Sequence, residues 1–234
     1  MNDVLHCLLA FITYIIIGAL MALTIRVVFK NIPSFVFRKV LHLVAFTSIV
    51  CMYQASESWV GPVLACVLFI VIVWPILVYL ERFSWYSGLF VEKEPGEIKM
   101  SLVILFAAAA LISFVMTGLL GRRDLASAAV IMWGAGDAMA AVIGQAFGRH
   151  HFKSSYIFRK TWEGTIAMFV TAVFSGILTL SIVSDLEMSS ILTLVLPTAL
   201  VCALVELYSP SEWDTVTVPA AAALLLAVIS KVVI

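Results

Sequence analysis

The sequence predicts an all-α, polytopic membrane protein folded as a single bundle of about eight transmembrane helices. Of its 234 residues, 63% are hydrophobic and only 12% are charged, which is far from the balance of a soluble domain. The apolar residues also occur in long runs that short polar segments separate. A helix needs about 20 apolar residues to cross a bilayer core of about 30 Å, so this length has room for about eight spans.

Each run is bounded by charged residues, proline or glycine, and each is long enough to cross a membrane. The expected spans are residues 4–28, 39–55, 60–80, 100–120, 125–148, 163–183, 189–208 and 215–233. The first run has no basic segment before it and continues at spanning length, so we expect a retained first helix. Because no internal repeat and no low-complexity linker interrupts the runs, residues 1–234 are expected to form one domain.

The distribution of lysine and arginine predicts the orientation in the membrane. Basic residues occupy alternate loops, which the positive-inside rule places in the cytosol. This topology puts the N-terminus and the C-terminus outside, with Arg122 and Arg123 as exceptions on the outer face. Those two residues either anchor the chain at the interface or indicate an error in one span. The loops expected in the cytosol contain Lys30, Arg38, Arg82, Lys93, Lys99, Arg149, Lys153, Arg159 and Lys160.

Overall charge and cysteine content exclude some classes of function. The formal net charge is zero, so no basic excess indicates a nucleic-acid partner. The four cysteines all fall in apolar runs without the spacing of a metal site or a disulfide framework. They are interpreted as small packing residues, namely Cys7, Cys51, Cys66 and Cys202.

The fifth run contains a carboxylate and a series of small residues. Asp137 lies about midway along it, where a carboxylate costs about 2.5–3.5 kcal/mol on insertion scales. Such a residue needs either a partner on a neighbouring helix or a function. A ridge of small residues spaced four apart allows close helix packing, within the chain or in a homodimer, or leaves room for a nucleotide. The ridge consists of Gly136, Ala140, Gly144 and Gly148.

The loop and helix start that follow are suited to binding phosphate. Thr161 is a plausible N-cap, and a helix N-terminus beside cations favours anions. Glu163 is unusual in a simple anion site, but Mg²⁺ favours one or two carboxylates together with phosphate oxygens and water. A topology signal is the alternative interpretation of the basic loop. Its cationic or titratable residues are Arg149, His150, His151, Lys153, Arg159 and Lys160.

Other polar groups lie at or near the same expected face. Arg38 and His42 are four residues apart near the start of the second span, with Lys39 beside them, so they share one helical face. His42 could act as a base, orient a phosphate or simply pack. Additional carboxylates either orient substrate or metal, or belong to solvated helix ends; these are Glu97, Glu206 and Asp214.

Two segments in combination resemble the signature of membrane enzymes that use CTP. These are GDAMAAVIGQAFGRH (136–150) and RKTWEG (159–164). One branch with this signature is the polyprenol kinase family, which includes dolichol kinase, phytol kinase and the yeast-type CTP-dependent diacylglycerol kinase. The other branch is phosphatidate cytidylyltransferase.

Two further segments favour the kinase branch. FRKVLHL (37–43) resembles the Arg-Lys-x-x-His element of the lipid-alcohol kinases, and VELYSPSEWDTVTVPAAA (205–222) resembles their closing Glu and Asp-Asn-x-x-x-Pro element. Thr215 stands where that element has asparagine. The lysine- and aspartate-rich closing signature of the cytidylyltransferases is absent from the sequence, and the chain is short for that branch.

The resemblance implies a kinase that uses Mg²⁺ and moves the γ-phosphoryl group of CTP from the cytosol onto a lipid alcohol in the bilayer. It implies a nucleotide and metal site containing Asp137, Lys160 and Glu163, with Lys160 on the phosphates and Glu163 on the metal. Asp137 would bind metal or act as the base, His42 would approach the acceptor hydroxyl, and further residues would contact the nucleotide. Those are Arg38, Lys39, Gly144, Gly148, Arg149, Lys153, Arg159 and Thr161.

Two alternatives to a kinase stay open at the level of sequence. A cytidylyltransferase would release pyrophosphate and form a CDP-lipid. A small transporter would use Asp137 and Glu206 in an ion path and would consume no CTP.

Overall fold

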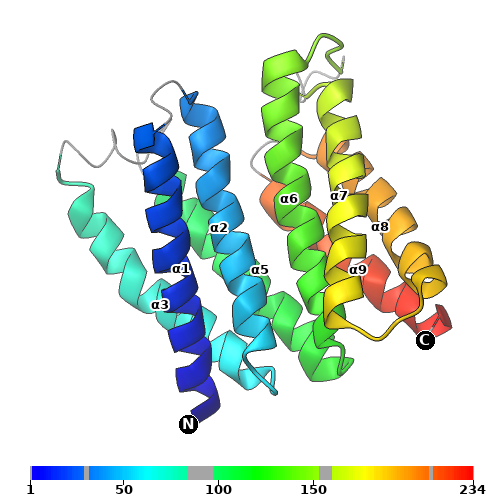
Figure 1. The fold of residues 1–234 in the computed structure, drawn as a ribbon, viewed down its shortest axis with the longest axis horizontal. Coiled ribbons are helices and arrows are strands. Elements are labelled where there is room, and N and C mark those ends of the chain that lie inside the picture. Colours follow the sequence, from blue (N-terminus) through cyan, green and yellow to red (C-terminus); the bar gives the residue numbers. More distant parts are fainter. Residues whose placement is uncertain (1, 29–31, 84–96, 153–159, 211–212, 234) are drawn as a thin grey trace. The chain divides into compact units, whose positions relative to one another are not determined.

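The computed structural model describes residues 2–28, 32–83, 97–152, 160–210 and 213–233, and these parts are helical apart from short connections (Figure 1). The helices are α1 (Asn2–Val28), α2 (Ser34–Gln54), α3 (Val60–Leu80), α5 (Glu97–Ile112), α6 (Arg123–Phe147), α7 (Trp162–Val183), α8 (Met188–Tyr208) and α9 (Asp214–Val233). α5 continues directly into a π-helix, η1 (Ser113–Leu119). The predicted all-α fold is confirmed.

Seven helical segments in the described residues are long and apolar enough to cross a membrane. A further apolar stretch over Asp3–Gly18 lies within α1, where the first span is predicted. The chain is therefore an integral, multi-pass membrane protein, and each predicted span coincides with a helix. Most helix ends lie within two residues of the prediction, because charged or turn-forming residues bound the apolar runs.

The start of α2 is an exception. The second span was predicted to begin at residue 39, but the helix begins at Ser34, after Pro33 as its N-cap. The Pro33 carbonyl accepts bonds from the amides of Val36 and Phe37, at 3.0 and 3.2 Å. Arg38 and Lys39 consequently lie inside the helix, where long cationic side chains can extend along it toward its N-terminal end.

The chain divides into two compact units, Met1–Phe114 and Val115–Ile234, so the single-domain organisation stays a prediction. In the first unit, α1 packs against α2 and α3, and α3 packs against α5. Phe11, Phe69 and Phe106 form an aromatic cluster with ring centroids 4.1 to 5.3 Å apart. The buried Tyr53 hydroxyl donates a hydrogen bond to the carbonyl of Ala109, which joins α2 to α5.

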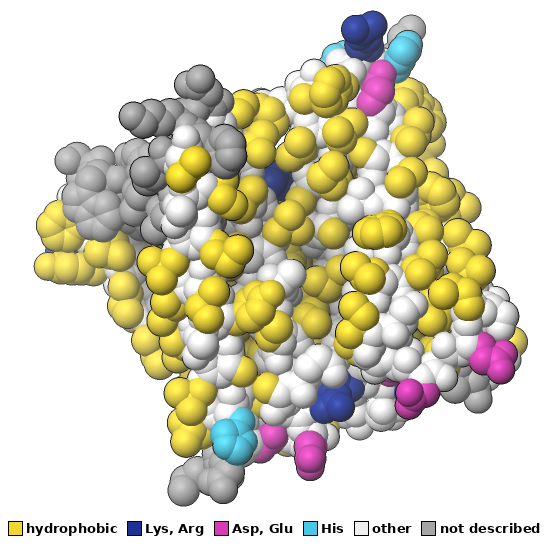
Figure 2. Space-filling model, in the orientation of Figure 1, with side chains coloured by type: hydrophobic (Ala, Val, Ile, Leu, Met, Phe, Trp, Pro, Cys, Tyr) yellow, Lys and Arg dark blue, Asp and Glu magenta, His cyan; other side chains and the backbone are white. Residues whose placement is uncertain are grey.

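In the second unit, α6 packs most extensively against α7 and also contacts α8 and α9. It is the most buried of the candidate spans, whereas α7 has one exposed apolar face with a spacing of four residues. That face has the composition expected for contact with lipid. Figure 2 shows hydrophobic side chains along these helices and charged or histidine side chains at their ends. The α7 face consists of Trp162, Ile166, Val170, Phe174, Leu178 and Ile182.

Arg122 has a partner that the sequence prediction did not include. Its guanidinium donates to both carboxylate oxygens of Asp124, from Nε at 2.9 Å and from Nη2 at 2.6 Å. A bidentate pair of this kind compensates the charge at the start of α6. The position of Arg122 and Arg123 on the outer face stays a prediction.

Candidate functional site

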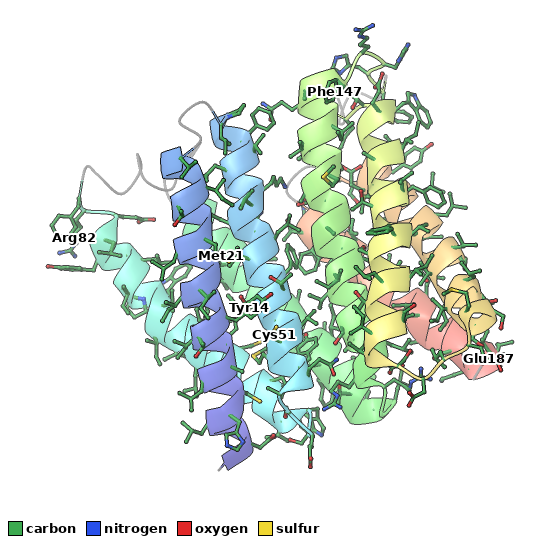
Figure 3. The ribbon with its side chains drawn as sticks, in the orientation of Figure 1. Tyr14, Met21, Cys51, Arg82, Phe147 and Glu187 are labelled. Carbon is green, nitrogen blue, oxygen red and sulfur yellow. The ribbon has the colours of Figure 1, made fainter. Side chains whose placement is uncertain are left out.

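Four helix ends meet at one end of the second unit. α6 and α8 end there, and α7 and α9 begin there, because consecutive helices in this unit are antiparallel. In Figure 3, Phe147 marks this end of α6 and Glu187 marks the opposite end of the unit. We call the first of these the polar end, and it contains Gly148, Lys160, Glu163, Glu206 and Asp214.

The ridge of small residues on α6 packs against the first turns of α7. A Cβ added at Gly144 would lie 3.0 Å from the Thr161 hydroxyl, and one at Gly148 would lie 2.6 Å from the Thr161 methyl group. A Cβ on Gly164 would lie 2.9 Å from the Ala140 carbonyl. The ridge therefore brings α7 close within the same chain, and the possible homodimer stays a prediction.

Thr161 is the N-cap of α7, as the sequence predicts. Its backbone is extended, and its hydroxyl accepts a hydrogen bond from the amide of Gly164 at 3.2 Å. The two ends of the α6–α7 loop pair with each other. The amide of Phe152 donates to the carbonyl of Lys160 at 3.0 Å, and the amide of Trp162 donates to the carbonyl of His150 at 3.0 Å. Lys160 is thus held on a fixed backbone immediately before the helix.

Lys160 forms ion pairs with two carboxylates from two other helices. Its ammonium nitrogen donates to Glu206 Oε1, at the end of α8, and to Asp214 Oδ2 at 3.0 Å, at the start of α9. The three side chains are only 11%, 8% and 17% exposed, in the order Lys160, Glu206, Asp214. The alternative of solvated helix ends is therefore wrong for Glu206 and Asp214.

The environment of Lys160 keeps its amine charged. Burial is the largest influence on the pKa of Lys160 and lowers it, but the attraction of Glu206 and Asp214 outweighs burial. The pKa of Lys160 is therefore raised above its ordinary value. Lys160 is therefore a positive charge at neutral pH that two carboxylates hold in place.

Asp137 belongs to the same electrostatic cluster. It is partly buried on α6, and its charge repels that of Glu206. With Lys160, Glu206 and Asp214, the cluster has three carboxylates and one ammonium group. Glu206 is thus a common neighbour of Asp137 and Lys160, and their shared role in a nucleotide site stays a prediction.

Glu163 has different contacts from Lys160, although they are three residues apart. Its carboxylate lies 2.7 Å from His150 Nδ1 and accepts the His150 amide proton at 3.2 Å. The His150 side chain is 79% exposed and that of Glu163 is 24% exposed. This pair lies at the outer edge of the polar end, where a water-soluble ligand can reach it.

Thr215, which departs from the resemblance, contacts the cluster. Its hydroxyl donates to Asp214 Oδ1 at 3.3 Å, while the other oxygen of Asp214 accepts from Lys160. A threonine hydroxyl therefore supplies a hydrogen bond at the position where the family element has an amide side chain. The sequence prediction missed this contact and noted only that Thr215 differs from the asparagine of the family element.

The other predicted residues lie in the first unit, at the exposed edge of the polar end, or outside the described residues. Arg38, Lys39 and His42 are partly buried on α2 in the first unit. Arg149 is exposed beside His150. Lys153 and Arg159 lie outside the described residues, as does the side chain of Glu97. Their predicted roles stay predictions.

A metal ion bound at the polar end would need oxygen ligands from a bound substrate in addition to protein side chains. Among the residues that the structure describes, no group of three or more His, Cys, Asp or Glu side chains is arranged to hold a metal. Mg²⁺ is nevertheless commonly held by one or two carboxylates together with phosphate oxygens and waters. Glu163 and Asp137, as hard oxygen ligands, fit that mode of binding.

The fold and this site define a polytopic membrane protein with a charged cluster at the joined ends of four helices. Comparison with known proteins gives the family. The chain is 30% identical to a phytol kinase from Synechocystis sp. over 203 residues, which cover 82% of this chain and 78% of that protein. The chain belongs to the family of CTP-dependent polyprenol and phytol kinases.

No family model matches the chain, and no solved structure matches it significantly.

Proposed function

We propose that this protein is a Mg²⁺-dependent kinase that transfers the γ-phosphoryl group of CTP to the hydroxyl of a lipid alcohol. One structural observation carries the proposal beyond family membership: a buried, charged lysine is held immediately before the capped N-terminus of α7. A helix N-terminus and an adjacent fixed cation together favour the binding of phosphate.

Phosphoryl transfer depends mainly on positioning and on neutralising the charge of the phosphates. In the proposed reaction, the lipid hydroxyl oxygen forms a bond to the γ-phosphorus as the bond to the β–γ bridging oxygen breaks. CDP leaves, and the hydroxyl proton passes to a carboxylate such as Asp137 or to water. Lys160 would bind phosphate oxygens at the start of α7, and the exposed Arg149 would add positive charge at the entrance.

Glu163 and Asp137 are the proposed metal ligands. The bound Mg²⁺ would neutralise phosphate charge and hold the nucleotide in line for transfer. Because Glu163 now contacts the exposed ring of His150, coordination by Glu163 would require that ring to move aside. The excess of carboxylates around Lys160 also favours a nucleotide that arrives with its divalent cation, since a bare triphosphate would be repelled.

The acceptor is proposed to be an isoprenoid alcohol, with diacylglycerol as the other member of the class to be tested. The relative is a phytol kinase, which makes phytol the first candidate, ahead of dolichol. A lipid alcohol places its hydroxyl at the membrane interface and its tail among apolar helix faces such as that of α7. Arg38, Lys39 and His42 are proposed to act on the phosphates and on the acceptor hydroxyl.

We propose that the polar end faces the cytosol, where CTP is available. The basic residues of the loop between α6 and α7 support this orientation through the positive-inside rule. In the same orientation, the opposite end of the second unit, with Asp185 and Glu187 and no lysine or arginine between α7 and α8, faces outward.

The test is to incubate the purified protein with γ-labelled CTP and Mg²⁺, in one reaction with a panel of lipid alcohols and in a parallel reaction with phosphatidate, and to identify the products by mass. A kinase gives CDP and a lipid monophosphate. Lys160→Ala and Glu163→Gln should abolish transfer, whereas the matched changes Lys231→Ala and Glu187→Gln, at exposed positions on the opposite end, should retain it. Pyrophosphate with a CDP-lipid would establish a cytidylyltransferase instead, and no consumption of CTP would exclude both enzymes.

A further inference from the structure

Within the described residues, the ion pairs of Lys160 occupy two of the donors of its ammonium group. An ammonium group has three N–H donors, and Glu206 and Asp214 accept two of them. A lysine side chain is otherwise a flexible stem with freely rotating donors. With two donors fixed by carboxylates on α8 and α9, the third N–H has a defined direction.

The two carboxylates are themselves held in place. Glu206 is buried near the C-terminal end of α8, and Asp214 opens α9. The Thr215 hydroxyl donates to Asp214 Oδ1 at 3.3 Å, which restricts rotation of that carboxylate. At the connection between the two helices, the Ser209 and Thr217 hydroxyls lie 2.7 Å apart. Hydrogen bonds at the start of α9 and between α8 and α9 thus hold in place the carboxylates that bind the amine of Lys160.

We propose that Glu206 and Asp214 are positioning residues, which hold the amine of Lys160 so that its remaining N–H binds a phosphate oxygen of the nucleotide. This inference rests on the proposed function and assigns a role in it to Glu206 and Asp214, which lie in the segment that resembles the closing element of the lipid-alcohol kinases. Neither carboxylate needs to contact the nucleotide or the metal. They affect phosphoryl transfer indirectly, because they keep the Lys160 ammonium charged and fix its orientation.

The arrangement also prepares Lys160 for the nucleotide. A lysine between two carboxylates stays protonated and ordered before the substrate arrives, so no reorganisation is needed when phosphate binds. A lysine facing solvent would instead lose side-chain freedom on binding. Glu206 and Asp214 therefore contribute by ordering Lys160 in advance.

Two kinds of measurement test this inference, on wild type and on Glu206→Gln, Asp214→Asn and Thr215→Val. In kinetics, the two carboxylate changes should lower kcat/KM for CTP by about 10- to 100-fold, the effect expected when a hydrogen bond to a charged group is weakened. Thr215→Val should lower it less. The matched controls are Glu187→Gln and Asp185→Asn, at exposed positions on the opposite end of the unit, and they should match wild type.

The second measurement needs no activity. Acetic anhydride modifies only the neutral form of an amine, so mass spectrometry of Lys160 acetylation against pH reports when this residue loses its proton. Acetylation should begin at lower pH in Glu206→Gln and Asp214→Asn than in wild type. The thermal unfolding of each variant in detergent should be compared with that of wild type. If the carboxylate variants do not fold, Thr215→Val, which alters no charge, gives the kinetic test.

The results separate this inference from the proposed function. A wild-type protein without kinase activity would overturn the proposed function, and the inference with it, even if the acetylation profile shifts as expected. If wild type is active but Glu206→Gln and Asp214→Asn keep its kcat/KM, the carboxylates do not position Lys160 for the nucleotide. An unchanged acetylation profile in folded carboxylate variants would equally overturn the inference, because Lys160 would then not depend on them.

Discussion

Gly164 on α7 approaches α6 so closely that a Cβ at this position would lie 2.9 Å from the carbonyl oxygen of Ala140. A backbone oxygen cannot move aside as a flexible side chain can. The contact fixes the separation of the two helices at the polar end and therefore the place of Lys160 and Glu163, which lie within four residues of Gly164.

Gly164→Ala should destabilise the second unit, because α6 and α7 must move apart to admit the methyl group. Overpacking of this kind costs about 1–3 kcal/mol. The measurement is thermal unfolding in detergent, with Gly144→Ala as the comparison. At Gly144 the nearest atom to a Cβ is the Thr161 hydroxyl at 3.0 Å, a side chain that has some freedom to shift, so the cost should be smaller. Equal stability of Gly164→Ala and wild type would contradict the close approach.

The N-cap of α7 provides a second prediction. Thr161→Ala removes the hydroxyl that accepts from the Gly164 amide, and it should cost about 1 kcal/mol of stability. Thr161→Ser keeps the hydroxyl and removes only the methyl group near Gly148, so it should remain close to wild type. Unfolding curves of the two variants check this, and a Ser variant as unstable as the Ala variant would show that methyl packing matters more than the cap.

The N-cap at Thr161 and the helix boundaries could both be predicted from the sequence, but for different physical reasons. α3 and α7 begin and end within a residue of their predicted limits, because charge and turn residues bound each apolar run. The cap at Thr161 follows from local side-chain chemistry. The start of α2 was misplaced because Arg38 was assigned to the preceding loop, although the helix that begins after Pro33 contains it.

The partners of Lys160 were not predictable in the same way. Glu206 and Asp214 are 46 and 54 residues away in sequence, and their pairing with Lys160 depends on how the ends of α8 and α9 approach α7. Sequence identified all three as polar residues near one face. It could not decide between a solvated and a buried carboxylate, since that difference arises from helix packing and not from local pattern.

Removing the Lys160 charge gives a third prediction. Lys160→Met should destabilise the protein by about 3–5 kcal/mol, because Glu206 and Asp214 would then lie close together without a compensating cation. Adding Glu206→Gln to that variant removes one of the uncompensated charges and should recover part of the loss. Thermal unfolding of the single and double variants tests this, and a double variant less stable than Lys160→Met would argue against charge compensation.

The stabilisation from Lys160 has a definite pH dependence. The pKa of Lys160 in the folded protein is raised above its ordinary value of 10.5, which represents the unfolded chain. The contribution of this group is therefore fully present below about pH 10.5 and is lost as the pH rises through the folded-state pKa. The stability difference between wild type and Lys160→Met should thus be constant between pH 7 and 9. A difference that already shrinks across this interval would mean that Lys160 is not held charged.

In the first unit, the hydroxyl of Tyr53 supplies a polar link between α2 and α5. Tyr53→Phe removes the hydrogen bond to the Ala109 carbonyl without changing the packed ring, and it should cost about 0.5–1.5 kcal/mol. The loss should appear in thermal unfolding. Phe46→Leu, at another buried aromatic residue of α2, serves as a packing control, since it removes volume but no hydrogen bond.

The orientation of the polar end can be tested with cysteine labelling. The four native cysteines lie within helices, and Cys7, Cys66 and Cys202 are buried, so the wild-type chain is a suitable blank. His150→Cys introduces a thiol at the polar end, where the native side chain is 79% exposed. Glu187→Cys introduces one at the opposite end of the same unit, also at an exposed position.

A membrane-impermeant maleimide added to intact cells should label Glu187→Cys and not His150→Cys, because a kinase that uses cytosolic CTP needs the polar end inside. In inside-out vesicles the pattern should reverse. Labelling of His150→Cys from outside would place the polar end away from the nucleotide and would contradict the proposed orientation. Because both positions belong to the second unit and lie at opposite ends of its helices, the paired result is independent of how the first unit is arranged.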